Sequence, residues 1–237
     1  MTLAQWTVAL LLFNHGAWAA CAATVDAASR TAWARARALH VRPASAAQRH
    51  AEVHESTISL AWYAAVQLGS VSLAAHGLSR LDLSAPSIAG GAAWAALFAG
   101  FVDTWWYWTH RWMHQPGVYR SVHRQHHRRR HPSPWASYAQ SSPESVINAA
   151  PYLLAPLLLP FPVHSLLAVH LVLTAFATIG HCGFEPFPAA WRARLPLRAF
   201  NAATHHQAHH IHGGGNFGSL TALWDTVCGT HHADREA

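Results

Sequence analysis

Apolar residues gather in four stretches of the chain that contain no Asp, Glu, Lys or Arg. The stretches are Met1–Val25, Thr57–Ser79, Leu83–Val102 and Ser145–Phe184. A helix needs about 20 mostly apolar residues to cross the hydrocarbon core of a membrane, so each of the first three is long enough for one crossing. Because helices satisfy their own backbone hydrogen bonds in lipid, we expect an all-helical integral membrane protein with about four membrane helices.

The fourth stretch is about twice as long as a single crossing requires. Its centre reads Pro160-Phe161-Pro162. Proline ends a helix because it lacks the backbone N–H and disfavours a helical conformation in the residue before it. We therefore expect a helical hairpin of two shorter segments, whose two ends lie on the same side of the membrane.

The first stretch has two interpretations. Ala17-Trp18-Ala19 resembles a signal-peptidase site behind an apolar run, which would make Met1–Val25 a cleaved signal peptide. No basic residue precedes the run, however, so the positively charged start of such a peptide is missing. We favour a retained membrane helix, and the signal peptide stays as the alternative.

Charge is sparse and unevenly placed. Only 11% of the residues are charged, against about 25% in a soluble domain. The basic residues are all arginines, and most of them gather in three segments that follow the first, third and fourth apolar stretches: Arg30–Arg49, Arg111–Arg130 and Arg192–Arg198. By the positive-inside rule these segments face the cytoplasm, which predicts a multi-pass protein of the cell membrane with its N-terminus outside.

The placement of the charges and cysteines excludes other classes. A net charge of +6 could indicate a nucleic-acid partner, but the arginines flank apolar runs instead of covering a soluble face. We therefore expect no nucleic acid. Cys21, Cys182 and Cys228 form no CxxC pair, so neither a disulfide framework nor a zinc ribbon is indicated.

Histidine is unusually frequent, with 21 residues, and eight of these form three clusters beside the ends of apolar stretches. The first cluster is His110–His114, with the pattern HxxxH, and it continues the third stretch. The second and third, His123–His127 and His206–His210, both read HxxHH. Residues three and four apart share a helix face, so each cluster should present its imidazoles to one side. A lone His181 lies near the end of the fourth stretch.

Such a set of imidazoles predicts a centre with two metal ions. Neutral imidazole is a good ligand for iron, copper, nickel and zinc, whereas a structural zinc site needs only four ligands. A site beside the bilayer could also take an unreactive C–H bond from the apolar side. The predicted ligands are His110, His114, His123, His126, His127, His181, His206, His209 and His210. The histidines that stand alone are expected to be ordinary packed or surface residues: His15, His40, His50, His54, His76, His164 and His170.

The order of the motifs adds a family resemblance. The sequence contains Asp103-x-x-x-Tyr107-x-x-His110-Arg-x-x-His114, then His123-x-x-His126-His127, Ser142-Pro143-Glu144, His181-Cys-Gly183-Phe-Glu185, His206-x-x-His209-His210, Asn216-Phe-Gly218 and Trp224-Asp225-x-x-x-Gly229-Thr230. In this order and spacing, the region from Phe101 to Thr230 resembles the fatty acid hydroxylase and sterol desaturase superfamily of membrane di-iron enzymes.

The resemblance implies a chemistry and its partners. It implies a histidine-rich helical cap on the cytoplasmic side and O2-dependent hydroxylation or desaturation of a lipid, whether fatty acyl, sterol or another hydrophobic substrate. Two iron ions are the expected cofactors, with zinc as the ion that an isolated protein could carry instead. Two electrons must come from an external donor of the ferredoxin or cytochrome type, because the sequence shows no flavin, haem or iron–sulfur motif. Residues 101–237 would form the catalytic region, and residues 1–100 the first membrane helices and a basic loop.

Four polar residues of these motifs are expected to support the histidines from behind: Asp103, Glu144, Asn216 and Asp225. Asp225 is the candidate partner for a histidine ring nitrogen. No side chain beyond the metal centre is required as an acid or a base. Some members of the family carry a second histidine four residues after the lone one, where this chain has Glu185. The roles of Glu185, His205 and His212 stay open.

Other functions fit the pattern less well. A metal transporter or sensor would place polar ligands inside the membrane, whereas these clusters lie just outside the apolar stretches. A zinc hydrolase would need a general base such as the glutamate of HExxH, and neither HxxxH nor HxxHH contains one here. A structural histidine-rich scaffold would hold a redox-silent metal. A membrane metal-binding or transport protein without redox catalysis is therefore the alternative.

Overall fold

The computed structural model describes residues 1–39, 44–84, 87–192, 194 and 199–232. His40 and parts of the Arg30–Arg49 and Arg192–Arg198 segments therefore lie outside the described residues. The described part is helical, and its β-structure is limited to isolated β-bridges. The elements are α1 (Leu3–Ser29), α2 (Ala32–Arg35), α3 (Ala46–Ala75), α4 (Ile88–Met113), α5 (Pro116–Val122), η1 (His126–Arg128), η2 (Pro134–Ala136), α6 (Ser142–Ala149), α7 (Pro151–Leu158), α8 (Val163–Gly180), α9 (Ala189–Arg192), α10 (Ala203–His212) and α11 (Leu223–Val227).

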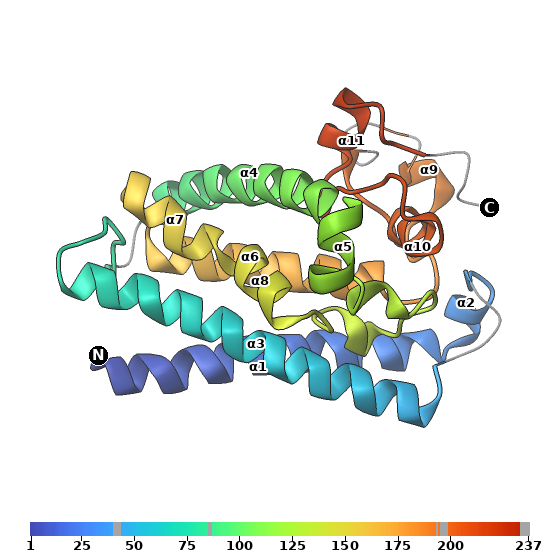
Figure 1. Ribbon diagram of the computed structural model, residues 1–237, viewed down its shortest axis with the longest axis horizontal. Helices are drawn as coiled ribbons and strands as arrows, with labels where there is room; N and C mark the ends of the chain where they lie inside the picture. Colours follow the sequence, from blue (N-terminus) through green and yellow to red (C-terminus); the bar gives the residue numbers. More distant parts are fainter. Residues whose placement is uncertain (40–43, 85–86, 193, 195–198, 233–237) are drawn as a thin grey trace.

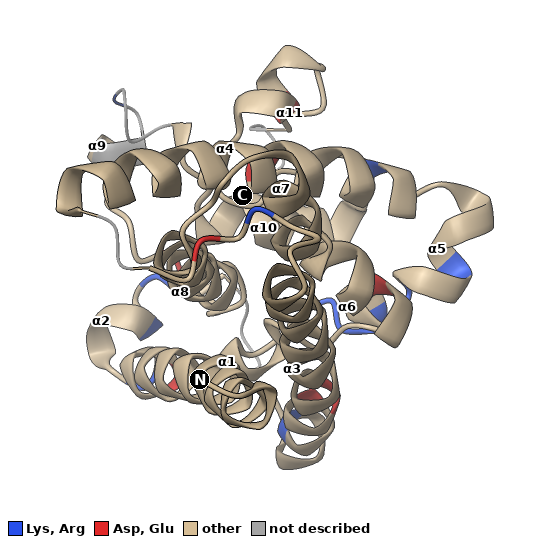
Figure 2. Ribbon diagram, turned by 90° about the vertical axis from the view of Figure 1, so that its left-hand side faces the viewer, with Lys and Arg blue, Asp and Glu red and all other residues tan. Residues whose placement is uncertain are grey.

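Four of these helices, α1, α3, α4 and α8, are long and apolar enough to cross a membrane. Their ribbons carry few charged residues (Figure 2). Large apolar side chains such as Val8, Leu12, Leu97 and Val172 are exposed on their outer faces, as expected of surfaces that meet lipid. The prediction of an all-helical protein with about four membrane helices is confirmed.

Local signals fix where the long helices begin. Ser45 caps α3 and Ser87 caps α4, each with its side-chain oxygen accepting a backbone N–H of the first turn. α1 and α3 lie side by side, and α8 lies between this pair and α4 (Figure 1). The membrane helices therefore form one bundle in which α8 contacts both α1 and α4.

The expected hairpin is present. α8 begins after Pro162, and the arm that enters from the other direction consists of two short helices, α6 and α7, instead of one. Its turn is fixed by Asp82: the N–H of Asp82 donates to the carbonyl of Phe161 at 2.9 Å, and Val163 donates to the carbonyl of Asp82 at 2.8 Å. The proline break thus returns the chain to the end of the bundle from which it came.

Aromatic residues dominate the core between the helices. The rings of Phe98 and Tyr152 lie 5.2 Å apart, and those of Trp94 and Phe161 lie 5.0 Å apart. Tyr63 packs edge-on against the ring of Tyr138 at 5.2 Å. Such pairs add to the free energy that area burial alone contributes. They hold α3, α4, α7 and α8 together below the segments that carry the histidines.

All the histidine clusters lie at one end of the bundle. α4 and α8 finish there, and α5, η1 and α10 cover that end (Figure 1). The hairpin thus brings His110–His127 and His206–His210 to the same side, as the two-metal hypothesis requires. That this side faces the cytoplasm stays a prediction.

Candidate metal centre

The structure gathers all nine predicted ligands into two groups. The five-histidine group consists of His110, His114, His123, His127 and His209. The four-histidine group consists of His126, His181, His206 and His210. Within each group the nitrogen atoms offered by the rings all lie within 4.8 Å of one another. Each group is therefore compact enough to surround a single ion.

Neighbouring histidines in the sequence belong to different groups. His126 and His127 separate, and so do His209 and His210. The expectation of one shared helix face fails at the second cluster, because His123 ends α5 and His126 begins the separate turn η1. On an α-helix such as α10, successive side chains point about 100° apart, so one turn can serve two ions. The HH pairs thus bring the two groups next to each other.

Backbone carbonyls fix the orientation of two rings in the five-histidine group. Nδ1 of His110 lies 2.8 Å from the carbonyl oxygen of Phe217, and Nδ1 of His209 lies 2.7 Å from that of Gly215. A carbonyl can only accept, so both Nδ1 atoms carry the proton. Both Nε2 atoms then present lone pairs to the interior of the group.

The four-histidine group shows the same arrangement. Nδ1 of His181 donates to the carbonyl of Ala177 at 2.6 Å, and Nδ1 of His210 donates to that of Arg129 at 3.2 Å. Their Nε2 atoms also point inward as acceptors. Lone pairs that converge without a donor repel one another, so each group has the electrostatic character of a cation site.

The spacing of the inner nitrogens also fits a metal ion. Two imidazole nitrogens bound about 2.1 Å from a first-row ion at right angles are about 3 Å apart. The measured Nε2–Nε2 distances are 3.0 Å for His110–His123, 3.0 Å for His127–His209, 3.1 Å for His114–His209, 3.1 Å for His206–His210 and 3.2 Å for His181–His206. The residues present therefore fit two metal ions.

The environment keeps these rings neutral. Burial lowers the pKa of His114 to about 3 and that of His181 to about 4. Burial and then neighbouring histidines also lower the pKa of His127 and His206 well below the usual value. At neutral pH the rings are therefore in the unprotonated form that binds metal ions.

Glu144 is the one carboxylate in direct contact with a predicted ligand among the described side chains. Its Oε1 lies 2.8 Å from Nδ1 of His123, and both side chains are 1% exposed. Burial raises the pKa of Glu144 well above its usual value, because the carboxylate loses its hydration. Its place at the start of α6, capped by Ser141, directs it toward the end of α5. The expectation that Glu144 supports the histidines agrees with this geometry.

Asp225 holds a backbone turn next to the five-histidine group. Its Oδ1 accepts the N–H of Phe217 at 2.9 Å, and its Oδ2 accepts that of Gly218 at 2.7 Å. A Cβ atom at position 218 would lie 2.2 Å from the carbonyl oxygen of Thr221, so only glycine allows this close approach. Hydrogen bonds lower the pKa of Asp225 despite its burial. Asp225 therefore holds the turn whose Phe217 carbonyl orients His110.

Asp103 and Asn216 also hold backbone. Oδ1 of Asp103 accepts the N–H groups of Leu220 and Thr221, both at 3.1 Å. Nδ2 of Asn216 donates to the carbonyl of His205 at 3.2 Å, and its positive φ of 57° turns the chain after Gly215. Both residues thus fix the C-terminal segment over the histidine groups.

The residues whose roles were open take structural places. Glu185 accepts both the N–H and the hydroxyl of Thr204, at 3.0 and 2.8 Å, and so holds the start of α10. Nε2 of His205 lies 3.5 Å from Oδ2 of Asp225, and His212 is the exposed last residue of α10. None of these three belongs to either group among the described residues.

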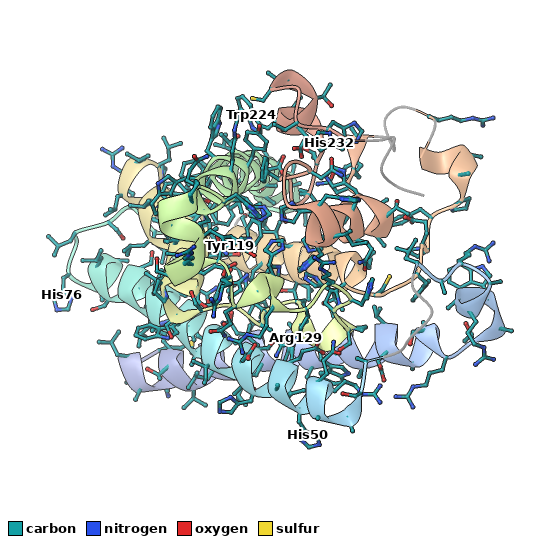
Figure 3. All side chains as sticks on the ribbon, turned by 45° about the vertical axis from the view of Figure 1, so that its right-hand side comes forward. His50, His76, Tyr119, Arg129, Trp224 and His232 are labelled. Carbon is teal, nitrogen blue, oxygen red and sulfur yellow. The ribbon has the colours of Figure 1, made fainter. Side chains whose placement is uncertain are left out.

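The lone histidines lie away from both groups. His50 and His76 point outward near the two ends of α3, far from the crowded centre (Figure 3). His54 and His164 are exposed as well, and His15 is half-buried, whereas His170 is fully buried among the membrane helices. The description as packed or surface residues fits their positions.

One supporting network was not expected from the sequence. Nη1 of Arg129 lies 2.7 Å from Oε2 of Glu55, and its Nε lies 3.6 Å from Oε1 of Glu52. These glutamates lie on α3, and the carbonyl of Arg129 is the one that orients His210. The pair at Glu52 and Glu55 stands in a charged stretch before the second apolar run, but no spacing links it to Arg129.

Comparison with protein families gives one match. The model of the family described as fatty acid hydroxylase matches residues 95–230, more than half of the 237 residues of the chain. The matched region contains all nine histidines of the two groups.

Curated relatives give a related picture. The chain is 28% identical over 188 residues to the Delta(7)-sterol 5(6)-desaturase of Eremothecium gossypii, covering 78% of this chain and 51% of the relative. It is 33% identical over 140 residues to that of Aspergillus fumigatus, covering 59% and 38%, and 33% identical over 141 residues to that of Schizosaccharomyces pombe, covering 60% and 44%. The chain thus spans about half the length of these relatives, or less. No solved structure matches it.

Proposed function

Because the chain belongs to the fatty acid hydroxylase family, we propose that it is a membrane-bound di-iron oxygenase that hydroxylates or desaturates a lipid. The observation that carries the proposal is the convergence of nine histidines into two ion-sized groups at one end of a bundle of apolar helices. A metal centre at that position meets lipid from one side and water from the other. The curated relatives are sterol desaturases, which favours a sterol-like lipid over a fatty acyl chain.

The overall reaction needs a partner for its balance. Hydroxylation converts R–H, O2, two electrons and two protons into R–OH and water. Desaturation removes two hydrogen atoms from adjacent carbons and converts O2, two electrons and two protons into two waters. We propose that the electrons come from an external ferredoxin- or cytochrome-type donor at the end of the bundle that carries the histidines.

The chain's own residues would bind the ions and keep their ligands in place. The five-histidine group would hold one iron and the four-histidine group the other, and together the ions would supply the activation of O2. The carbonyls of Phe217, Gly215, Ala177 and Arg129 hold the proton on Nδ1 of their histidines, which leaves Nε2 free to ligate. The carboxyl group of Glu144 does the same for His123.

Burial would protect the reaction. His110 and His209 are each 1% exposed, and the segment held by Asp225 covers them. Water would thus have little access to the centre, which protects a reactive oxidant from side reactions. His114 and His127 of the five-histidine group and His206 of the four-histidine group are the less buried rings of the centre.

A proposed location follows from the charges. The arginine-rich segments follow α1, α4 and α8, and these three helices finish at the end of the bundle that carries the histidines, which favours a cytoplasmic site in the cell membrane. We propose residues 101–237 as the catalytic region, with α1 and α3 packed beside it.

The test is lipid mass spectrometry of a host with and without the protein under ¹⁸O2. The proposal predicts a lipid that gains one ¹⁸O atom, or one that loses two hydrogens, only in cells that express the wild-type chain. The matched control is His209→Ala, which removes a predicted ligand. Unchanged lipids together with a bound but redox-silent metal would favour the metal-binding alternative instead.

A further inference from the structure

A small cavity of about 30 Å³ lies between the membrane helices and the histidine groups. Its walls come from α3, α4, α6, α7 and α8 and from the segment before α6, and α3, α4 and α8 are candidate membrane spans. Val102 and Leu173 contribute apolar wall, whereas Gln140, Asn148 and His170 contribute polar groups. Such polar groups at membrane depth are costly and usually mark a functional site.

The polar wall is unpartnered. Nε2 of His170, Oε1 of Gln140 and both side-chain atoms of Asn148 have no hydrogen-bond partner among the described residues. The three side chains are 1%, 3% and 3% exposed. Nδ1 of His170 is bound to the hydroxyl of Tyr152 at 2.8 Å, so this ring is held in place with one nitrogen left over. Most buried side-chain polar atoms are paired, so four unpaired atoms around one cavity indicate a place where a polar group can bind.

The cavity is separated from both histidine groups by a single layer of residues. Trp106 lines it, and the ring of Trp106 lies 5.9 Å from that of His110. Ala177 also lines it, and its carbonyl accepts the Nδ1 hydrogen of His181 at 2.6 Å. Asn148 lies one helical turn after Glu144, which contacts His123. A group bound in the cavity would therefore lie next to the reacting centre.

We propose that this cavity binds the hydroxyl group of the lipid substrate, so that the substrate is a neutral alcohol oxidised close to its polar end. The inference rests on the proposed function and deepens it. Asn148 offers both a donor and an acceptor, and Gln140 offers an acceptor, which is the pairing that a hydroxyl needs. No arginine lines the cavity, so a carboxylate would be left without a countercharge.

The size of the cavity supports the same assignment. A cavity needs roughly 10–15 Å³ to hold a water-sized group, so this cavity has room for a hydroxyl and little more. The apolar body of the substrate would lie outside it. The oxidised carbon would therefore be a few bonds from the oxygen, and not far along an acyl chain.

A binding experiment tests the assignment without requiring turnover. The probes are the alcohol cholest-7-en-3β-ol and the hydrocarbon cholest-7-ene, and the protein is the metal-loaded, detergent-purified full chain. We expect the wild-type protein to bind the alcohol about 10-fold more tightly than the hydrocarbon, as two new hydrogen bonds would allow. Asn148→Leu keeps the size of the side chain. It should reduce this preference to less than about 3-fold, because it weakens the binding of the alcohol and leaves the binding of the hydrocarbon unchanged.

The matched control is Asn14→Leu, the same change at a residue of α1 that is also fully buried but lies outside the cavity. It should leave the preference unchanged. If Asn148→Leu loses its metal, Gln140→Leu provides the second measurement of the same kind. The inference would be overturned if the wild-type protein bound both probes with equal affinity. It would also be overturned if metal-loaded Asn148→Leu or Gln140→Leu protein kept the whole preference for the alcohol over the hydrocarbon.

The outcomes separate the two proposals. A preserved preference for the alcohol in a protein that oxidises no lipid would contradict the proposed function and leave the hydroxyl site standing. Oxidation of a lipid with no loss in the Asn148→Leu variant would contradict the hydroxyl site alone.

Discussion

Oε1 of Glu144 lies 2.8 Å from Nδ1 of His123 in a contact from which both side chains exclude water almost completely. Because Nδ1 is engaged, the Nε2 atom of His123 is directed at that of His110, 3.0 Å away. A carboxylate behind a ligating histidine fixes the ring and makes it a better ligand. We therefore regard Glu144 as the main positioning residue of the five-histidine group.

Replacing Glu144 should weaken metal binding in a graded way. Glu144→Gln replaces the carboxyl group with an amide that can still accept from Nδ1, whereas Glu144→Leu leaves Nδ1 without an acceptor. We expect the affinity for the ion of the five-histidine group to fall about 10-fold in the first variant and about 100-fold in the second, the range typical of such partners. Titration with a chelator and elemental analysis measure it. Equal affinities in all three proteins would show that the contact does not support the site.

Adjacent histidines should lose different ions. His209→Ala removes a ligand of the five-histidine group, and His210→Ala removes one of the four-histidine group. Each variant is expected to retain about one of two irons, with different spectra for the ion that remains. Iron analysis and Mössbauer spectroscopy check this, with the exposed His50→Ala as the control that keeps both. Identical residual spectra in the two variants would contradict the division into two groups.

The contact of Arg129 with α3 should matter for the four-histidine group. Arg129→Met removes the cation beside the buried carboxylate of Glu52, which keeps only its hydrogen bonds from Gln48 and Ser133, and it releases the segment whose carbonyl holds His210. We expect a loss of about 3 kcal/mol in the free energy of unfolding and weaker binding of that group's ion. Denaturation in detergent and metal analysis measure both.

Arg128→Met is the matched control for that variant. The Arg128 side chain is 61% exposed, and its Nη1 lies 3.7 Å from Oε1 of Glu55, which makes a weaker contact than that of Arg129. It should change the free energy of unfolding by less than about 1 kcal/mol. Equal effects of the two substitutions would mean that Arg129 is an ordinary surface residue.

The orientation of the bundle can be measured with two exposed serines. Ser121 lies at the end that carries the histidines, and Ser84 lies in the loop before α4, at the opposite end. After removal of the three native cysteines, Ser84→Cys should react with a membrane-impermeant thiol reagent in intact cells, and Ser121→Cys only after the cells are opened. The reverse pattern would place the histidines outside, and labelling of both from outside would contradict a bundle that crosses the membrane.

The sequence predicted which histidines come together better than it predicted how they divide into two groups. Spacing and position beside apolar runs identified the nine histidines, and the Pro160–Pro162 break identified the hairpin that brings them together. The family match confirms the resemblance that these motifs indicated. Spacing cannot tell which of two adjacent rings belongs to which ion, because that depends on where α5 ends and η1 begins.

Long-range contacts are the second feature that could not be predicted from the sequence. Asp225 was expected to face a histidine ring nitrogen, and its Oδ2 lies 3.5 Å from Nε2 of His205, a residue outside both groups. Its hydrogen bonds to the backbone of Phe217 and Gly218 are contacts that no periodicity encodes. The link between Arg129 and Glu55 joins residues 74 positions apart. His170 was predicted to be an ordinary packed residue, and only the structure shows that one of its nitrogens is left without a partner.

The most direct test of the central claim is Mössbauer spectroscopy of the wild-type protein loaded with ⁵⁷Fe, recorded in the reduced state and again after exposure to O2. The two histidine groups predict two irons per chain, both ferrous at first and both oxidised by O2. A protein that binds one iron or none, or two irons whose ferrous spectrum O2 leaves unchanged, would contradict the assignment of this centre as a di-iron oxygenase site.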